Sequence, residues 1–211
     1  MSYILRVLWT LTPREAPRPL LACSSCGDVR PFHSSGKIRL NANGKRLDAW
    51  LIYRCDQCDE TWNRPVFDRR SIRSLDPAVL AAASDSDQVF VAACAFDMEG
   101  LRRYARQIET SSDVAISKTV KEPARSRATA LEIELGVALA TDLRIDRLLS
   151  RELGMSRTRV TALFDRGLLT TNVGGKNALR RSVKDGVCIM LELSGVSDAA
   201  ALLDAAAGLQ V

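Results

Sequence analysis

Two pairs of cysteines restrict how this 211-residue chain can fold more than any other feature of its sequence. Cys23 and Cys26 form one pair and Cys55 and Cys58 the other, each with two intervening residues. Two thiolates three positions apart on a tight turn bind one tetrahedral ion, and two such turns complete a shell of four sulfurs. We therefore expect these four cysteines to hold a structural Zn²⁺ ion. A complete shell leaves no open position for substrate or water, which argues against a catalytic metal.

Other uses of the cysteines remain open. Iron fits the same sulfur shell, and a Cys-x-x-Cys pair can also serve as a redox dithiol or form disulfides. A redox dithiol needs a thioredoxin-like setting and disulfides need an oxidising compartment, and the sequence indicates neither. His33 lies near enough to replace a ligand, but we expect an ordinary loop residue because four cysteines already satisfy zinc. Cys94 and Cys188 lie in apolar runs, where free cysteine is a small buried hydrophobe.

Residues 1–72 are predicted to form a zinc-ribbon-like β domain around this site. Asn43-Gly44 is a preferred hairpin turn, flanked by strand-like residues 37–41 and 47–53. The second strand ends at Cys55, so pairing the hairpin with the strand before Cys23 brings the two cysteine turns together. Residues 3–9 also have strand character. We expect the aromatic residues of the module to form core around the metal rather than to stack on bases: Trp50, Tyr53 and Trp62.

Residues 73–140 are predicted to form a middle segment of helices and strands. Asp76-Pro77 is typical of a helix start, and Asp97 begins a second helical pattern that continues to Ile108. Alternation predicts strands at 114–117 and 131–135, with an exposed loop at 121–127 between them. The segment contains no glycine-rich phosphate loop and no Ser/His/Asp set, and the whole chain has one histidine. We therefore expect that the protein is not an enzyme.

Composition indicates a globular chain whose two ends are basic. Hydrophobic residues make up 46% of the sequence, and charged residues are spread along it. Lysine and arginine outnumber acidic residues by 12 to 7 in residues 1–70 and by 10 to 5 in residues 141–191, whereas residues 71–140 hold 8 against 10. Such asymmetry favours an anionic partner for one or both ends, although a solvated basic face gives the same count.

We expect a cytoplasmic protein without a membrane partner. Residues 20–23 match a lipid-attachment box, but residues 13–19 are charged and proline-rich where a secretory signal needs an apolar stretch of about 7–15 residues. No stretch approaches the roughly 18 apolar residues of a membrane span. Thiols stay reduced in the cytoplasm, where cysteine clusters usually mean metal or catalysis.

Residues 141–195 are predicted to form a small α+β module, followed by a short C-terminal helix within 196–211. Apolar spacing predicts a helix that ends at Gly154 and a second that starts at the N-cap Ser156 and ends at Gly167. Strands are expected at 168–172 and 187–191. The residues of this module predicted to bind RNA are Arg144, Arg147, Ser156, Arg157, Arg159, Lys176, Arg180, Arg181 and Lys184.

Two of these arginines lie where a helix dipole disfavours cations. Arg157 and Arg159 occupy the first turn of the second helix, and this placement is explained if a phosphate binds at that N-terminus. Backbone N–H groups and guanidinium forks would then converge on the phosphate. A solvated basic face remains the alternative, because two arginines placed against the dipole cost little.

Three stretches resemble the alpha-L RNA-binding motif of small-subunit ribosomal protein S-four: 144–149, 156–160 with Leu163-Phe164, and 167–172 with 183–186. The resemblance implies binding of structured RNA through the second helix and the adjacent loop, and it carries over to Ser156, Arg157, Arg159 and Arg181. The chain departs from the motif at Val173 and Val187. Residues 41–55, with Cys58 and 61–63, are similar to the uncharacterised bacterial family known as domain of unknown function one-zero-six-two.

The sequence therefore predicts an α+β protein with a zinc-ribbon-like β module, a helical and strand middle segment and an alpha-L-like module. The expected function is non-catalytic binding of structured RNA, either ribosomal or transfer RNA. The alternative is a protein-interaction adaptor in transcription or stress response, which binds a protein partner through the zinc module and no RNA. An RNA-modifying enzyme ranks third, because no catalytic domain is visible.

Overall fold

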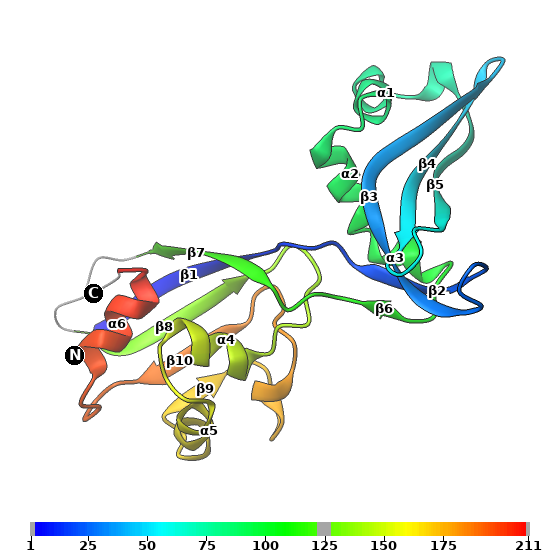
Figure 1. Cartoon of the computed structure of the whole chain (residues 1–211). Helices are drawn as coiled ribbons and strands as arrows, with labels where there is room; N and C mark the ends of the chain where they lie inside the picture. The colour runs from blue at the N-terminus through cyan, green and yellow to red at the C-terminus, as the bar shows by residue number, and fades with distance from the viewer. Residues whose placement is uncertain (1–2, 122–127, 210–211) are drawn as a thin grey trace. The chain divides into compact units, whose positions relative to one another are not determined.

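The computed structural model describes residues 3–121 and 128–209 and confirms a mixed α+β fold (Figure 1). The chain divides into two compact units, which are described separately. Unit 1 comprises Met1–Arg14 and Ser111–Val211, and unit 2 comprises Glu15–Thr110. Most of the loop predicted at 121–127, and the last two residues of the C-terminal segment, lie outside the described residues.

This division differs from the four consecutive segments expected from the sequence, with limits at 72, 140 and 195. The N-terminal strand β1 (Tyr3–Pro13) belongs to unit 1 because it pairs in parallel with β8 (Ala128–Gly136) and antiparallel with β7 (Val114–Val120). Alternation of side chains identifies a strand but not its partner, and the partners of β1 lie more than one hundred residues away along the chain. Unit 2 is thus inserted between β1 and β7.

Unit 2 is an antiparallel sheet in the order β5-β4-β3-β2-β6. Its strands are β2 (Arg18–Cys23), β3 (Asp28–Asn43), β4 (Arg46–Cys55), β5 (Thr61–Ser71) and β6 (Ile108–Glu109). The predicted hairpin is β3 and β4, and Gly44 in its turn has a φ of 59° that a glycine adopts at little cost. The strand β5, which continues the sheet beyond β4, was not predicted.

Three short helices pack on one face of this sheet. They are α1 (Pro77–Ser84), α2 (Gln88–Ala95) and α3 (Met98–Arg102), preceded by the 3₁₀ turn η1 (Ile72–Ser74). Asp76, Asp87 and Asp97 cap α1, α2 and α3 through side-chain oxygens that accept backbone N–H groups. The helix predicted after Asp97 is shorter than expected, because it ends at Arg102 and Ile108 lies in β6 instead.

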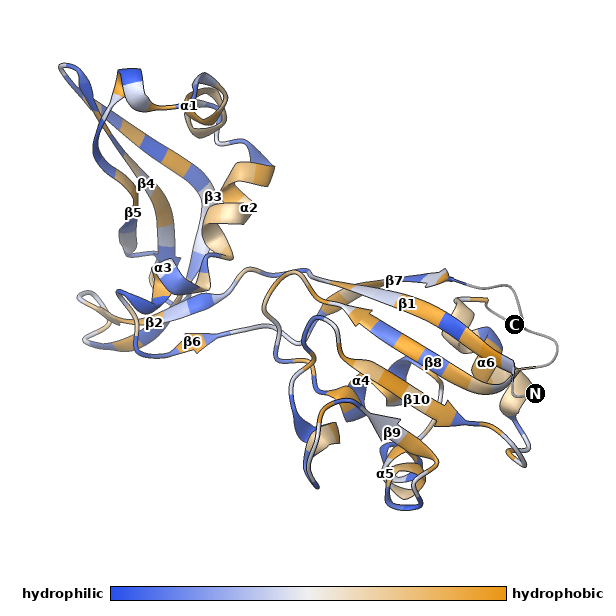
Figure 2. Ribbon diagram, turned by 180° about the vertical axis from the view of Figure 1, so that it is seen from behind, coloured by the Kyte–Doolittle hydropathy of each residue, from blue (hydrophilic) through white to orange (hydrophobic). Residues whose placement is uncertain are grey.

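Unit 1 contains a second sheet in the order β7-β1-β8-β10-β9, completed by β9 (Leu169–Thr171) and β10 (Cys188–Glu192). Helices α4 (Ile145–Glu152), α5 (Arg157–Asp165) and α6 (Ala199–Ala207) and the 3₁₀ turn η3 (Ala178–Arg180) complete the unit. Figure 2 shows hydrophobic residues concentrated along β1, β8 and β10, whose buried side chains form one core with α4, α5 and α6.

Trp9 fixes the C-terminal helix to this core. Its indole is fully buried, and its Nε1 donates a hydrogen bond of 2.9 Å to the carbonyl of Ala206 in α6. Lys118 lies 4.9 Å from the Trp9 ring and forms an ion pair with Glu152.

In the part of the chain that the structure describes, no single helix is long and apolar enough to span a membrane, and only the sharply bent pair of α1 and α2 reaches that length and composition together.

Candidate functional site

The four paired cysteines lie at the ends of two hairpins of unit 2. Cys23 is the last residue of β2 and Cys26 lies in the turn to β3, and likewise Cys55 ends β4 and Cys58 lies in the turn to β5. The turns share one backbone pattern, because Gly27 N donates to Cys23 O at 2.9 Å and Asp59 N donates to Cys55 O at 3.1 Å. Two similar turns therefore present their sulfurs to one centre.

The distances among the sulfurs fit a single tetrahedral ion. The four Sγ atoms lie within 4.8 Å of one another, with 3.4 Å between Cys23 and Cys58 and 3.9 Å between Cys26 and Cys55. A tetrahedron with metal–sulfur bonds of about 2.3 Å has edges of about 3.8 Å. Cys23 and Cys55 are buried, whereas Cys58 is exposed. These four residues together can hold a metal ion, as the sequence predicted.

The thiols of this cluster influence one another strongly. Hydrogen bonding to Cys58, together with burial, raises the pKa of Cys26 to about 12. Burial also acts to raise the pKa of Cys55, but backbone N–H groups of Gln57 and Cys58 outweigh it and lower the pKa to about 7. Four thiolates at these distances repel one another, and a bound cation removes that penalty.

Polar side chains hold the second cysteine turn in place. His33 Nδ1 lies 2.6 Å from one carboxylate oxygen of Asp56, and Arg18 donates to the other oxygen at 2.9 Å. Arg18 also contacts Glu109 in β6 at 3.1 Å. His33 lies in β3 and outside the sulfur cluster, so its contact with Asp56 orients the turn that carries Cys55 and Cys58.

The residues predicted to bind RNA lie in unit 1, on α4, α5 and the segment 176–184. Arg144 precedes α4 and forms an isolated β-bridge with Ser182. Ile145 N donates to Arg181 O at 3.1 Å, which places the start of α4 beside the segment with Arg180 and Arg181. Ser156 caps α5, because its Oγ accepts the backbone N–H of Arg159 at 3.2 Å.

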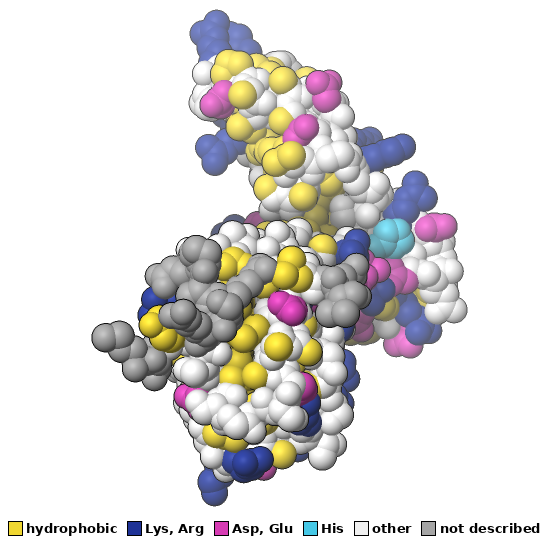
Figure 3. All heavy atoms as spheres, turned by 90° about the vertical axis from the view of Figure 1, so that its left-hand side faces the viewer, with side chains coloured by type: hydrophobic (Ala, Val, Ile, Leu, Met, Phe, Trp, Pro, Cys, Tyr) yellow, Lys and Arg dark blue, Asp and Glu magenta, His cyan; other side chains and the backbone are white. Residues whose placement is uncertain are grey.

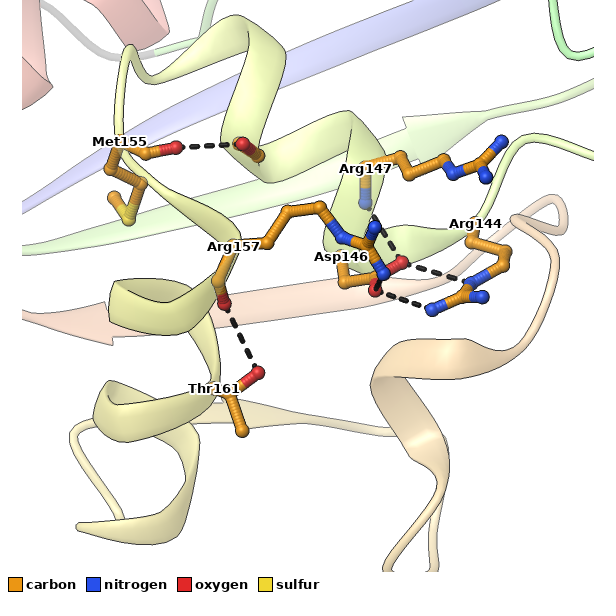
Figure 4. A network of polar contacts seen from close by, with 7 residues as sticks. Arg144, Asp146, Arg147, Met155, Arg157 and Thr161 are labelled. Carbon is orange, nitrogen blue, oxygen red and sulfur yellow. Dashed lines mark hydrogen bonds and ion pairs between the residues drawn. The ribbon is translucent and has the colours of Figure 1, made fainter.

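A buried carboxylate joins two of the predicted arginines (Figure 4). Asp146, only 5% exposed, accepts from Arg144 Nε at 3.0 Å and from an Arg157 guanidinium nitrogen at 2.9 Å. Arg147 donates its backbone N–H to the same carboxylate at 2.9 Å, and its side chain extends past it. Burial acts to raise the pKa of Asp146, but hydrogen bonds from Arg144 and Arg157 outweigh it and lower the pKa.

Arg159 lies apart from these arginines. Both of its terminal nitrogens contact the carboxylate of Asp198, at 2.6 and 2.5 Å, and the hydrogen bonds raise the pKa of Arg159. Residues 157 and 159 are two positions apart and therefore point to different sides of α5. The structure thus does not bring Arg157 and Arg159 together at one phosphate position.

A hollow of about 670 Å³ lies beside α5, and we call it the basic hollow. Its lining includes Asp146, Arg157, Phe164, Asp165, Lys176 and Arg180. In the described part of the chain, no acidic side chain forms an ion pair with Arg147, Lys176, Arg180, Arg181 or Lys184. The hollow therefore lies between α5 and the segment 176–180, on a surface with more cations than acids.

Two partners of the predicted RNA-binding arginines were missed from the sequence. Asp146 binds Arg144 and Arg157, and Asp198 binds Arg159. Asn172 has a structural role, because it links β9 to β10 by accepting from Cys188 N and donating to Gly186 O, both at 2.9 Å. Asp146 follows Arg144 by two residues, so the sequence contained a local signal for the Arg144–Asp146 pair. Asp198 is 39 residues from Arg159, and no spacing rule predicts that pair.

Comparison with known proteins gives one finding. The model of the family described as "Protein of unknown function (DUF1062)" matches residues 40–174, which is more than half of the chain. The matched residues include the second cysteine turn, α4 and α5. No curated protein and no solved structure matches the chain.

Proposed function

Since the chain belongs to the DUF1062 family, for which no activity is described, we propose that it is a non-catalytic protein that binds structured ribosomal or transfer RNA. The observation that carries this proposal is the basic hollow. Arg157 lines it from α5, Lys176 from the loop before η3 and Arg180 from η3 itself, and Arg144 and Arg147 contact Asp146, which is also part of the lining. Closely placed guanidinium and ammonium groups suit a phosphate backbone.

The charge balance of the hollow supports an anionic ligand. The negative charge of Asp146 neutralises the charge of one of the two arginines that it binds. Asp165 is the other acidic residue of the lining. Lys176 and Arg180 form no ion pair with described residues, so their charges remain available to a ligand. Anchoring by Asp146 also fixes the Arg157 guanidinium, which reduces the entropy lost when a phosphate binds.

The hollow is better suited to a folded RNA than to stacked bases. Phe164 is the one aromatic residue of its lining, and it packs partly against the core of unit 1. Recognition would then depend on contacts to phosphates and 2′-hydroxyl groups across an A-form surface. Such contacts recognise the shape of the RNA and not its base sequence. The resemblance to the alpha-L motif supports the same class of ligand.

We propose that the metal held by Cys23, Cys26, Cys55 and Cys58 is Zn²⁺ and that it is structural. Zinc prefers a tetrahedral shell of four thiolates, and such a shell is closed to substrate. The ion would fasten the β2–β3 turn to the β4–β5 turn. A cytoplasmic location accords with four free thiols at this spacing.

Binding of purified, zinc-loaded full-length protein to total tRNA and to ribosomal RNA fragments tests the proposal. We expect Lys176→Ala/Arg180→Ala to lower the affinity at least about tenfold, because two phosphate contacts are lost. The matched control is Arg102→Ala/Arg103→Ala, which removes the same charge from unit 2 and should leave the affinity within about twofold. Equal affinities for the wild type and the Lys176→Ala/Arg180→Ala variant would contradict the proposal.

A protein-interaction adaptor is the second candidate, and the apolar surface of α1 and α2 favours it. Neither helix contains a charged residue, and Val89 is 79% exposed. Figure 3 faces the side of unit 2 where these helices lie and shows hydrophobic side chains gathered there with acidic ones among them. The adaptor function is favoured if the protein does not bind RNA and if α1 and α2 are protected from chemical labelling in cell extract. Val89→Asp should abolish that protection.

A further inference from the structure

The two faces of the unit 2 sheet differ in what covers them. Along β4, Leu51 and Tyr53 are fully buried and pack with Val91 and Leu101 of the helices. The alternate residues Trp50, Ile52 and Arg54 therefore point to the opposite face. In the described chain, neither Trp50 nor Ile52 belongs to a hydrophobic core cluster, although both are partly exposed apolar residues.

Of the three aromatic residues predicted to form core, Trp50 is the one that lies outside the described core cluster. The rings of Tyr53 and Trp62 pack at a tilt with a centroid distance of 5.2 Å, and Trp62 packs edge-on to Tyr104 at 5.4 Å, all on the covered face. These two rings form core around the helices, as the sequence predicted for all three aromatics. Trp50 lies at the middle of β4 on the uncovered face and is half-buried.

Cations flank Trp50 on this face. Arg39 in β3 is the direct cross-strand partner of Trp50, and Arg54 follows Trp50 by four positions on β4. Arg39 and Arg54 are exposed, as is Lys37, two positions before Arg39. We call the surface formed by Lys37, Arg39, Trp50, Ile52 and Arg54 the open face.

The cations of the open face lack acidic partners among the described residues. The nearest acidic side chains in the strand register are engaged elsewhere. Asp48 accepts the backbone N–H of Arg69 at 2.6 Å, and Asp56, beyond Arg54, is held by His33 and Arg18. Three cations without an ion-pair partner among the described residues therefore lie on the same face as Trp50, with the carboxylate of Asp48 as the nearest acidic group on β4.

We propose that the open face binds single-stranded nucleic acid. A base would stack on the Trp50 ring, with Ile52 extending the apolar surface, and the flanking phosphates would contact Arg39 and Arg54. Side chains two positions apart on a strand are separated by about 6.6–6.8 Å, and direct cross-strand neighbours by about 4.5–5.5 Å, so all these groups reach one extended strand. Stacking combined with a cationic surface is how sequence-tolerant single-strand binding is achieved.

This surface is independent of the basic hollow, because it belongs to the other unit and uses an aromatic platform that the hollow does not have. Its ligand is an unpaired strand, whereas the hollow is proposed for folded RNA. The two proposals can therefore succeed or fail separately in experiments on the same full-length protein.

Titration of the zinc-loaded full chain with oligouridylate and oligodeoxythymidylate of about ten nucleotides tests the inference. We expect binding to quench the tryptophan fluorescence of the wild type. Both Trp50→Ala and Arg39→Ala/Arg54→Ala should lose affinity by about tenfold or more. Trp50→Phe should keep most of the affinity but lose the quenching, since Trp9 and Trp62 are buried or packed in the core. Arg102→Ala/Arg103→Ala and Lys176→Ala/Arg180→Ala should bind these oligonucleotides like the wild type.

Three results would overturn the inference. They are absence of binding at low salt, undiminished binding by Arg39→Ala/Arg54→Ala, and quenching that persists in Trp50→Phe. A thermal melt of each variant shows whether it is still folded, so that a loss of binding by a folded variant can be attributed to the open face. If Trp50→Ala proves unfolded, the arginine variant and Trp50→Phe still decide the question.

Discussion

Gly27 and Asp59 occupy equivalent positions in the two cysteine turns and share a left-handed backbone conformation, with φ of 69° and 60°. Each directly follows the second cysteine of its pair and donates its N–H to the carbonyl of the first. Glycine adopts this conformation freely, whereas an L-residue pays about 1–2 kcal/mol for it, with aspartate among the more tolerant. One turn is thus relaxed at this position and the other is strained.

Substitutions at these two positions should affect the free energy of unfolding differently. We expect Gly27→Ala to lower the free energy of unfolding by about 1 kcal/mol and Asp59→Gly to leave it unchanged or raise it by up to about 1 kcal/mol. Nothing lies within 4 Å of a Cβ built at Gly27, so the cost is one of backbone conformation. Urea unfolding of the zinc-loaded protein measures both, and equal effects of the two substitutions would contradict this interpretation.

Metal content should depend on the clustered cysteines and not on the others. We expect one zinc ion per purified chain by elemental mass spectrometry, lost in Cys23→Ser. Cys94→Ser is the matched control, since Cys94 lies outside the cluster, and it should retain the ion. Chelation should accelerate amide hydrogen exchange in β2–β5 while unit 1, which has its own core, keeps its protection. A metal-free protein with the same exchange pattern would contradict a structural role.

The buried carboxylate of Asp146 should make unit 1 sensitive to acid. Its pKa in the folded protein is lowered, so the stability that it contributes is fully present above the unfolded value of about 3.9 and is lost as the pH falls through the folded value. Asp146→Asn should cost about 1–3 kcal/mol at neutral pH and reduce the loss of stability below pH 4. Unfolding free energies measured from pH 7 to pH 3 test this. Parallel pH profiles for the wild type and the variant would refute it.

Arg159 should contribute little to RNA binding, although the sequence predicts that it does. Its guanidinium is engaged by both oxygens of Asp198 and lies outside the basic hollow. We expect Arg159→Ala to keep RNA affinity within about twofold of the wild type, because it removes no contact at the hollow. Arg180→Ala provides the comparison, since Arg180 lines the hollow. A larger loss for Arg159→Ala than for Arg180→Ala would show that the ligand lies elsewhere.

Local sequence signals predicted local structure well. The Asn43-Gly44 turn, the cap residues Asp76 and Ser156 and the pairing of the cysteines each depend on residues close in the chain, and the structure contains all of them. The similarity to the uncharacterised family is also confirmed. The zinc-ribbon and alpha-L resemblances remain predictions.

Non-local relationships were not predictable in the same way. The strand β1 was recognised, but its assignment to unit 1 depends on pairing with residues 114–136. The Arg159–Asp198 pair joins residues far apart in the chain, so alternation and helical spacing do not reveal it. Alternation along one strand places Trp50 and Tyr53 on opposite faces, but it does not say which face the helices cover. That assignment, and the placing of Trp62 on the same face as Tyr53, depend on the packing of α2 and α3 and on the register of β4 and β5.

The salt dependence of RNA binding shows whether Lys176 and Arg180 contact phosphates. For wild-type protein and Lys176→Ala/Arg180→Ala, we would measure affinity for the same folded tRNA from about 50 to 200 mM salt, where release of counterions dominates. We expect affinity to fall steeply with salt for the wild type and the variant to bind more weakly, with a slope smaller by about 2. Identical slopes and affinities, or no binding at the lowest salt, would contradict the proposed RNA binding.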